Sequence, residues 1–293
     1  MEKIGIIGLG NMGMGIAKNL IKGGYATMGY DLRKECLEEI VTHGGEAAES
    51  VSQIGKLCDV VFVMVMNGNQ VKEVVTQLSP GLNGRGTIII TATITPEEVR
   101  EAYNIAKGSN IRMVDSPVSG GLDGAHEGTL TLMTSADDKT FSDCHDILDV
   151  ISKDIFHVGK NIGDGQTVKA SLQSFIGSTF AAIFESLVLG SKAGIDGKIL
   201  YDVFSSSGVS SPLFKNCAKL IMDRKFENTG SHISTMYKDL GITMDMAKKN
   251  GVPMFTTGAA FELFQAGISM YPEGDNWSIV KVLEKMADTK VEW

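Results

Sequence analysis

The feature that most constrains this chain is the segment IGIIGLGNMGMGIAKNL, residues 4–20. Gly8, Gly10 and Gly13 lie between an apolar run that predicts a strand and a stretch that predicts a helix. In such a unit the first glycine makes a tight turn, the second lets backbone approach a pyrophosphate, and the third allows close helix–strand packing. The helix N-terminus then faces the anion. We therefore predict a dinucleotide-binding unit at this end of the chain.

An acidic residue extends the pattern. Asp31 ends the next predicted strand, where a carboxylate accepts hydrogen bonds from ribose hydroxyls and repels a 2′-phosphate. This favours NAD over NADP. Arg33 complicates the prediction, because an arginine in that loop can bind a 2′-phosphate. A tight turn beside a solvated aspartate is the alternative explanation that needs no ligand.

The first half of the chain alternates between predicted strands and helices. Apolar runs separated by helices indicate a mostly parallel sheet covered on both faces. We predict an α/β, doubly wound Rossmann domain over residues 1–163. The strands are expected at residues 3–8, 26–31, 59–66, 87–93, 111–118, 130–136 and 154–159. The helices are expected at residues 12–22, 51–57, 71–78, 96–107 and 137–152, with a further amphipathic stretch that follows the second strand and ends at residue 41.

The second half has a different pattern, in which we find no convincing strand. We predict an all-α C-terminal domain over residues 164–293, joined to the first by a long interdomain helix. Glycines and prolines stand where the helix ends need them. The helices are expected at residues 164–193, 196–207, 212–224, 231–250, 256–269 and 277–285.

Composition narrows the class of protein. The net charge of −8 argues against a nucleic-acid or membrane surface. The most apolar stretch, residues 175–190, contains Glu185 and is interpreted as a buried helix and not as a membrane span. The start of the chain leads straight into a strand, so we expect no signal peptide. The four cysteines lie far apart and the histidines show no metal-ligand spacing, so we expect a cytoplasmic protein without a metal site.

A second motif, DSPVSGG at residues 115–121, follows a predicted parallel strand. Ligands in such sheets bind at the carboxyl ends of the strands. Ser119, Gly120 and Gly121 offer a hydroxyl and bare backbone N–H groups, which suit a small carboxylate. A structural turn would account for the same residues.

A third motif places a lysine at the domain boundary. Gly165, Lys169, Gln173 and Gly177 are spaced four apart and share one face of the predicted helix. The glycines leave room for something to approach, and a lysine in a cleft can have its pKa lowered and act as general acid/base. The alternative is an ordinary solvated lysine. Lys238, in KDLGI, would by itself indicate only a solvated helix start.

Together these segments resemble the β-hydroxyacid dehydrogenase family over essentially the whole chain. GLGNMGMGIAKNL resembles the family's GLGxMGxxMAxNL, although Gly15 and Ile16 stand where other members often have different residues. DSPVSGG resembles its DxPVSGG substrate loop, and GDGQTVK its GxGxxxK catalytic helix. KDLGI resembles its KDLxLA segment, and DNWSIVKVLE its C-terminal DxSAxxxxxE.

The resemblance implies hydride transfer between NAD, or NADP, and a small 3-hydroxy acid or the corresponding semialdehyde or keto acid. Lys169 would exchange the hydroxyl proton beside Gln173, and residues 119–121 and Lys238 would bind substrate. The resemblance also implies a homodimer or homotetramer that packs through the long helix. The implied cofactor-binding residues are Gly8, Leu9, Gly10, Asn11, Met12, Gly13, Asp31, Asn67, Thr93 and Lys238.

The chain departs from the family pattern at positions that bear on the substrate. Gln173 stands where most members have Asn, as in the branch that resembles L-threonate dehydrogenases. Residues 90–93 read ITAT in place of DMST, residues 65–67 read VMN in place of LPN, and residues 206–214 match no subgroup closely. The candidates are threonate or erythronate, glycerate, 3-hydroxyisobutyrate, 2-(hydroxymethyl)glutarate and sulfolactate-type acids. We favour a polar acid of three or four carbons.

Two other functions share this architecture. An imine reductase usually replaces the lysine, and a non-catalytic cofactor-binding assembly domain loses it and gains appended modules. Lys169 argues against both.

Overall fold

The computed structural model describes residues 2–82, 84 and 86–293. The chain forms two compact units, Met1–Lys169 and Ala170–Trp293. The limit between these units lies inside helix α8 (Asp164–Lys192). The functional domain boundary expected at residues 163 and 164 coincides with the start of this helix and remains a prediction.

The first unit is built on a nine-stranded sheet with the order β3-β2-β1-β4-β5-β6-β8-β7, in which β9 pairs with β8. Neighbouring strands from β3 to β6 are parallel, whereas β8 runs antiparallel to β6 and β7. This order is that of the doubly wound dinucleotide fold, so the predicted Rossmann domain is confirmed. The strands are β1 (Lys3–Ile7), β2 (Ala26–Tyr30), β3 (Glu46–Ala47), β4 (Val60–Val63), β5 (Thr87–Ile90), β6 (Arg112–Asp115), β7 (Val118–Ser119), β8 (Leu130–Ser135) and β9 (Ser152–Gly159).

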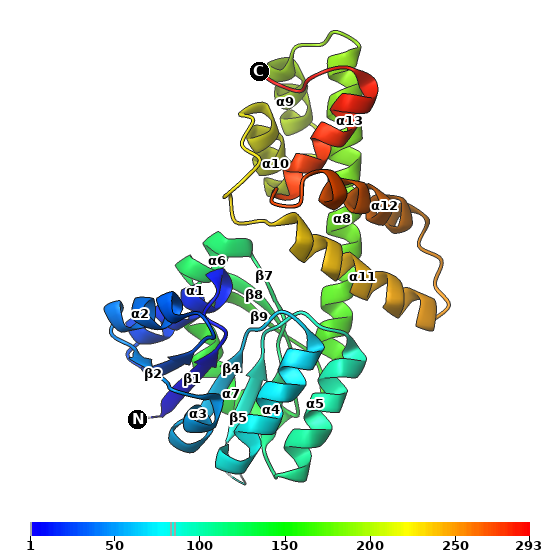
Figure 1. The fold of residues 1–293 in the computed structure, drawn as a ribbon. Helices are drawn as coiled ribbons and strands as arrows, with labels where there is room; N and C mark the ends of the chain where they lie inside the picture. Colours follow the sequence, from blue (N-terminus) through cyan, green and yellow to red (C-terminus); the bar gives the residue numbers. More distant parts are fainter. Residues whose placement is uncertain (1, 83, 85) are drawn as a thin grey trace. The chain divides into compact units, whose positions relative to one another are not determined.

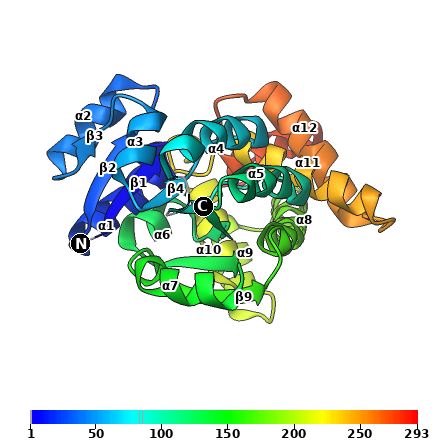
Figure 2. The ribbon, with the colours of Figure 1, turned by 90° about the horizontal axis from the view of Figure 1, so that it is seen from below.

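Helices cover both faces of this sheet (Figure 1, Figure 2). Side chains of a strand alternate between faces, so Ile4 and Ile6 of β1 enter one core cluster and Ile7 enters the other. Burial on both faces explains the unbroken apolar runs of these strands. One face is covered by α1 (Asn11–Lys22), α2 (Lys34–Thr42), α6 (Gly121–Glu127) and α7 (Asp138–Asp149), and the other by α3 (Val51–Leu57), α4 (Gly68–Leu82) and α5 (Pro96–Gly108).

Some elements differ from the prediction. The strand expected over residues 111–118 is interrupted at Pro117, which has no N–H to donate. Strand β3 and helix α6 were not predicted, since β3 has two residues and α6 begins at glycines. Gly120 and Gly121 there adopt φ values of +133° and +64°, conformations that side chains rarely allow. Helix α4 starts earlier than predicted and continues through Pro80.

The second unit is helical, as predicted. Its elements are the rest of α8, α9 (Gly197–Ser206), α10 (Pro212–Met222), α11 (Ile233–Lys249), α12 (Phe255–Met270), the 3₁₀ helix η1 (Asn276–Ile279) and α13 (Val280–Ala287). Within the described part of this unit, β pairing is limited to one isolated bridge between His232 and Asp275. The long helix α8 carries Phe180 and Phe184 into the core, where the ring of Phe180 contacts those of Phe264 and Trp277.

Helix α8 is more apolar than expected. By length and composition it is sufficient to cross a membrane, with a mean hydropathy of 1.4 in its most apolar window. A single helix of this kind is a weak indication, because the core helix of a globular unit meets the same criterion. Phe184 and Leu187 of α8 are fully buried in the core of the second unit.

Candidate dinucleotide and hydroxy-acid site

The glycine turn after β1 has the geometry that a bound pyrophosphate requires. Gly8 has a φ of +92°, and a Cβ there would overlap the carbonyl oxygen of Met64. A Cβ on Gly13 would overlap the carbonyl oxygen of Gly8, so the helix can approach the turn only without a side chain. At Gly10 the nearest atom to an added Cβ is Nη2 of Arg33, at 3.4 Å. The backbone is therefore packed against protein at the outer glycines and open at Gly10.

The first turn of α1 carries the backbone N–H groups that the sequence predicts to face a pyrophosphate. Gly10 is the N-cap and no side chain caps the helix, so the N-terminal N–H groups at Asn11 and Met12 have no capping partner. The Leu9 amide differs, since it donates to Oδ2 of Asp31 at 2.8 Å. The Leu9 amide therefore connects the glycine turn to the end of β2.

Asp31 follows β2 and is held by Arg33. The Arg33 backbone N and Nε donate to Oδ1 at 2.9 and 3.0 Å, and Nη2 donates to Oδ2 at 3.1 Å. Burial alone would raise the pKa of Asp31, but the hydrogen bonds from Arg33 and Leu9 outweigh it and lower the pKa. With the Leu9 amide, four donors occupy this carboxylate. A ribose hydroxyl must therefore share or displace the Arg33 contacts.

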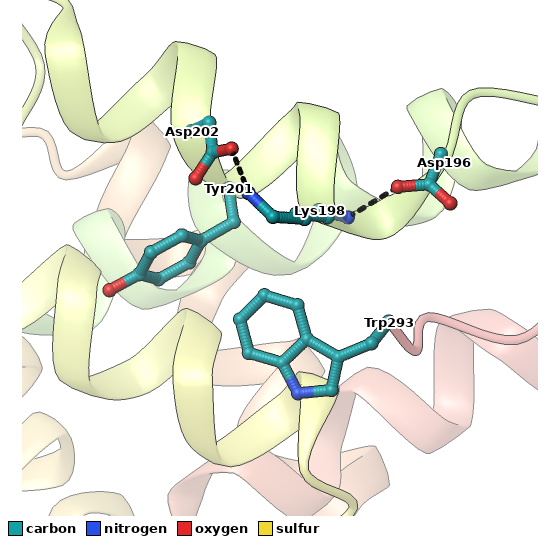
Figure 3. Close-up of a pocket in the computed structure, with 5 residues that line it drawn as sticks. All are labelled: Asp196, Lys198, Tyr201, Asp202 and Trp293. Atoms are coloured by element: carbon teal, nitrogen blue, oxygen red, sulfur yellow. Dashed lines mark hydrogen bonds and ion pairs between the residues drawn. The ribbon is translucent and has the colours of Figure 1, made fainter.

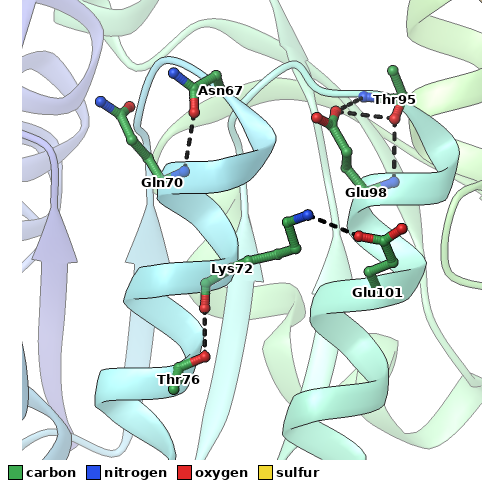
Figure 4. Close-up of polar contacts among 7 residues, drawn as sticks. All are labelled: Asn67, Gln70, Lys72, Thr76, Thr95, Glu98 and Glu101. Atoms are coloured by element: carbon green, nitrogen blue, oxygen red, sulfur yellow. Dashed lines mark hydrogen bonds and ion pairs between the residues drawn. The ribbon is translucent and has the colours of Figure 1, made fainter.

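Two more predicted cofactor residues follow parallel strands at the same edge of the sheet. Asn67 follows β4 and caps α4, its Oδ1 accepting the Gln70 amide at 3.0 Å (Figure 4). Thr93 follows β5 in the loop that ends at Thr95, the N-cap of α5. Because parallel strands end at one edge, this loop lies on the same side as the glycine turn and Asp31.

The DSPVSGG segment ends at this edge as well. Ser119 is the last residue of β7 and is partly buried, while Gly120 and Gly121 are exposed. Their left-handed backbone turns the chain into α6. The structure thus presents exposed backbone where the sequence predicts a carboxylate to bind.

The start of α8 is hydrogen-bonded to a buried carboxylate. Asp115, at the end of β6, is fully buried, and burial raises its pKa to about 6 although hydrogen bonds from Gln166, Gly163 and Ser135 oppose the shift. Lys169 lies one turn beyond Gln166 and is 7% exposed. Lys169 is therefore not the solvated surface lysine of the alternative interpretation.

On the second unit, Gln173 and Lys238 converge on Asp239. Nε2 of Gln173 donates to Oδ2 of Asp239 at 2.5 Å, and Nζ of Lys238 lies 3.0 Å from Oδ1. Gln173 and Asp239 are both buried. Gln173 lies four residues after Lys169 on α8, so the two side chains leave the same face of that helix.

The glycines around Lys169 do not leave room for a ligand, and that interpretation was wrong. A Cβ at Gly165 would overlap the carbonyl oxygen of Met133 and would lie 2.9 Å from that of Asp115. A Cβ at Gly177 would lie 2.7 Å from the Leu240 side chain. The space is filled by strand backbone at Gly165 and by α11 at Gly177.

A surface hollow of about 580 Å³ lies elsewhere in the second unit, between Lys198, Tyr201 and Trp293 (Figure 3). None of the predicted site residues lines it. Nζ of Lys198 is already paired with Asp202 at 2.5 Å. The hollow is large enough for a small ligand, but its lysine is already paired and it contains no predicted site residue. We therefore do not assign the hydroxy acid to it. Among the described residues, no group of three or more His, Cys, Asp and Glu side chains is arranged to hold a metal ion.

Comparison with known proteins decides the family. Residues 3–159 match the NAD-binding domain of 6-phosphogluconate dehydrogenase, and residues 163–283 match the NAD-binding domain of NADP-dependent 3-hydroxyisobutyrate dehydrogenase. The chain belongs to the β-hydroxyacid dehydrogenase family. It is therefore an oxidoreductase that uses a nicotinamide dinucleotide, and the open Gly10 and uncapped α1 fit that cofactor.

Several relatives in this family match the chain over almost its full length. A 2-(hydroxymethyl)glutarate dehydrogenase of Eubacterium barkeri is 33% identical, covering 99% of this chain and 97% of its own. An L-threonate dehydrogenase of Cupriavidus necator is 31% identical, covering 96% of each chain. The crystal structure of a 3-hydroxyisobutyrate dehydrogenase from Salmonella typhimurium superposes with a TM-score of 0.89 at 27% identity, covering 96% of this chain and all of that one.

Sequence reasoning did not anticipate the side-chain contacts that four residues make beside the predicted site. Asp115, Gln166 and Asp239 stand inside the motifs already quoted, but spacing shows no buried hydrogen bond between segments that are distant in sequence. Arg33 was considered as a binder of a 2′-phosphate, and not as the partner of Asp31.

Proposed function

We propose that this dehydrogenase acts on a polar hydroxy acid of three or four carbons with NAD, and that Lys169 is its general acid/base. The main support for the proposal is that Lys169 is buried on the same face of α8 as Gln173. The side-chain amide of Gln173 is in turn hydrogen-bonded to Asp239. Lysine is rarely buried without a functional or structural partner, so its burial needs a reason.

When bound, NAD would supply the hydride acceptor for oxidation and, in its reduced form, the hydride donor for reduction. In the oxidation direction, Nζ of Lys169 accepts the proton of the substrate hydroxyl, and in reduction it returns that proton to the carbonyl oxygen. The side-chain amide of Gln173 donates one N–H to Asp239. The carbonyl oxygen and the second N–H of Gln173 can then orient a substrate hydroxyl. Such an amide favours a polar substrate.

The substrate carboxylate is assigned to the exposed backbone at Gly120 and Gly121 together with the Ser119 hydroxyl. Lys238, which forms an ion pair with Asp239, is assigned to the binding of substrate and cofactor. The names of the relatives support this class, because 2-(hydroxymethyl)glutarate and L-threonate are both small hydroxy acids. We also propose a homo-oligomer and a cytoplasmic location, supported respectively by apolar residues exposed on α8 and by four buried free cysteines.

The test is NADH formation by purified protein with a panel of hydroxy acids, compared between wild type and Lys169→Ala. General acid/base groups contribute about 10²–10⁴-fold, so we expect the variant to lose that factor in kcat while binding NAD normally. Lys248→Ala is the control, since Lys248 is an exposed lysine near the end of another helix, α11. Near-normal turnover in Lys169→Ala would remove this lysine from the mechanism.

A further inference from the structure

The Asp115 carboxylate connects the end of the sheet to the start of α8. Its Oδ2 accepts the backbone amides of Gly163 and Gln166, at 2.9 and 3.3 Å. The Ser135 hydroxyl donates to the same oxygen at 3.1 Å. Oδ1 accepts Nε2 of Gln166 at 2.8 Å. A fully buried carboxylate thus acts as the N-terminal cap of a helix that begins almost fifty residues later in the sequence.

Gln166 extends this contact to the loop after β5. Its Nε2 also donates to the carbonyl oxygen of Ala92 at 3.0 Å, and its Oε1 accepts the amide of Ile94 at 3.1 Å. These two backbone groups flank Thr93, the predicted cofactor residue. The Gln166 side chain is 1% exposed, and both ends of its amide are bonded to the protein. One side chain therefore fixes the Thr93 loop from both sides.

We propose that Asp115 and Gln166 are positioning residues that hold the Thr93 loop and the first turns of α8 in one register, and so place Lys169. The inference rests on the proposed function of Lys169. Lys169 follows Gln166 by three residues, so a rotation or slip of the helix start displaces its ammonium directly. Displacements of about 1 Å at a reacting group can cost about 10²-fold in rate.

The bonding pattern exceeds what a helix cap alone requires. An Asp, Ser or Thr side chain that is not fully buried caps other helices of this chain, such as the half-buried Thr95 for α5 and the exposed Asp137 for α7. A buried carboxylate costs desolvation free energy, which its raised pKa reflects. Because the Asp115 carboxylate and Gln166 together connect the start of α8 to the Thr93 loop, the structure offers a reason why this costly buried carboxylate is present. Gly165 allows the arrangement, because any side chain there would collide with the ends of β6 and β8.

The test combines Asp115→Asn and Gln166→Met with Lys169→Ala in a double-mutant cycle. An asparagine keeps the size of Asp115 but meets the surrounding N–H donors with an amide group, and methionine keeps the length of Gln166 without its hydrogen bonds. We expect each variant to lower kcat at saturating NAD about 10–100-fold. Gln166→Met should also raise the Kd of NAD, because it removes both hydrogen bonds that hold the backbone beside Thr93. In the Lys169→Ala background we expect the same substitutions to cost less than about twofold, since the group they position is absent.

Ser116→Ala is the matched control. Ser116 is fully buried beside Asp115, and its hydroxyl is hydrogen-bonded to the Thr134 side chain at 2.8 Å, a contact that involves neither α8 nor the Thr93 loop. We expect it to lower thermal stability while kcat stays within about twofold of wild type. Hydrogen exchange adds a readout independent of turnover: the amides of Gly163, Gln166 and Ile94 should lose protection in Asp115→Asn and Gln166→Met and keep it in the control.

The outcomes separate the two proposals. Wild-type kcat in both positioning variants, or equal losses with and without Lys169, would overturn the positioning role while leaving the function of Lys169 intact. Full activity of Lys169→Ala would overturn the proposed function. In that case exchange protection decides whether Asp115 and Gln166 hold the two segments together. If Asp115→Asn does not fold, Gln166→Met carries the same comparison.

Discussion

At the scale of single residues, the predicted cofactor preference rests on one carboxylate, that of Asp31, for which Arg33 and a ribose hydroxyl would compete. Asp31 was predicted to select NAD by accepting ribose hydroxyls, and Arg33 was considered only as a residue that can bind a 2′-phosphate. In the structure the guanidinium is bonded to Asp31 through two nitrogens, although the Arg33 side chain is 53% exposed. The pair therefore contains a group that repels a 2′-phosphate and a group that attracts one.

We expect the wild type to prefer NAD, because the Asp31 carboxylate remains charged at neutral pH with its pKa lowered. Asp31→Ser should shift the ratio of kcat/KM toward NADP by about tenfold or more, since it removes the repulsion and frees Arg33. Arg33→Ala should shift it in the opposite direction. Both cofactors are measured at one salt concentration. A wild type that prefers NADP, or an Asp31→Ser ratio equal to wild type, contradicts the argument from charge.

Asp115 makes the stability of the chain depend on pH in a defined direction. Burial raises its folded-state pKa to about 6, from an ordinary value of 3.8. The folded chain therefore binds the proton more tightly than the unfolded chain, and ionisation lowers stability as pH rises between these two values. The loss is complete above the folded pKa.

An asparagine at position 115 does not titrate, so the comparison isolates this residue. We expect the free energy of unfolding of wild type, relative to Asp115→Asn, to be larger at about pH 5 than at about pH 8, by about 1–2 kcal/mol. Urea unfolding at the two pH values measures it. A difference between the two proteins that is the same at both pH values would show that the pKa of Asp115 is not raised.

At the scale of elements, the sequence predicts what periodicity controls. Strand β1 and the helices of the second unit were predicted with limits close to those observed, whereas β4 and β5 begin within one residue of the predicted start and end three residues earlier than predicted. The elements that were missed, β3 and α6, are too short to show a period, and α6 begins at two glycines in left-handed conformations. Contacts such as Asp115 with Gln166 depend on tertiary placement, which no local pattern reports.

Gly165 illustrates how the role of a residue in an element can be misread. The sequence suggested that this glycine leaves space beside Lys169, whereas the structure fills that space with the backbone of β6 and β8. We expect Gly165→Ala to lower the free energy of unfolding by about 1–3 kcal/mol, because the added methyl collides with backbone that cannot yield.

Gly241→Ala is the matched control, since Gly241 lies inside α11 with its nearest neighbour, Phe261, 4.0 Å from an added Cβ. There the methyl meets no obstacle and helix propensity should raise stability by up to about 1 kcal/mol. Urea unfolding of both variants measures the contrast. Equal stabilities for Gly165→Ala and wild type would mean that the start of α8 can move away from the strands.

At the scale of the whole molecule, the exposed face of α8 bears on assembly. Val168, Phe175, Ala182 and Leu189 are all exposed and spaced seven residues apart, so they form one line along this helix. Phe175 and Leu189 are 70% and 72% exposed. Met286 of α13, which is 79% exposed, lines a surface groove together with Leu189. Apolar side chains exposed in a continuous row are characteristic of a protein–protein interface.

We therefore expect a homodimer or homotetramer in which this row is covered by a second copy of the chain. Burying a large apolar side chain contributes about 1.5–3 kcal/mol, so several of them on each of two copies can support a stable dimer.

Leu189→Glu places a carboxylate in that contact and should raise the dissociation constant by at least about 30-fold, which corresponds to about 2 kcal/mol. Lys290→Glu is the control, because it also adds negative charge at an exposed position, outside this row. Sedimentation velocity over a range of concentrations measures both variants against wild type. A wild type that sediments as a monomer at micromolar concentration would refute the assembly, and equal dissociation constants for Leu189→Glu and wild type would move the interface away from α8.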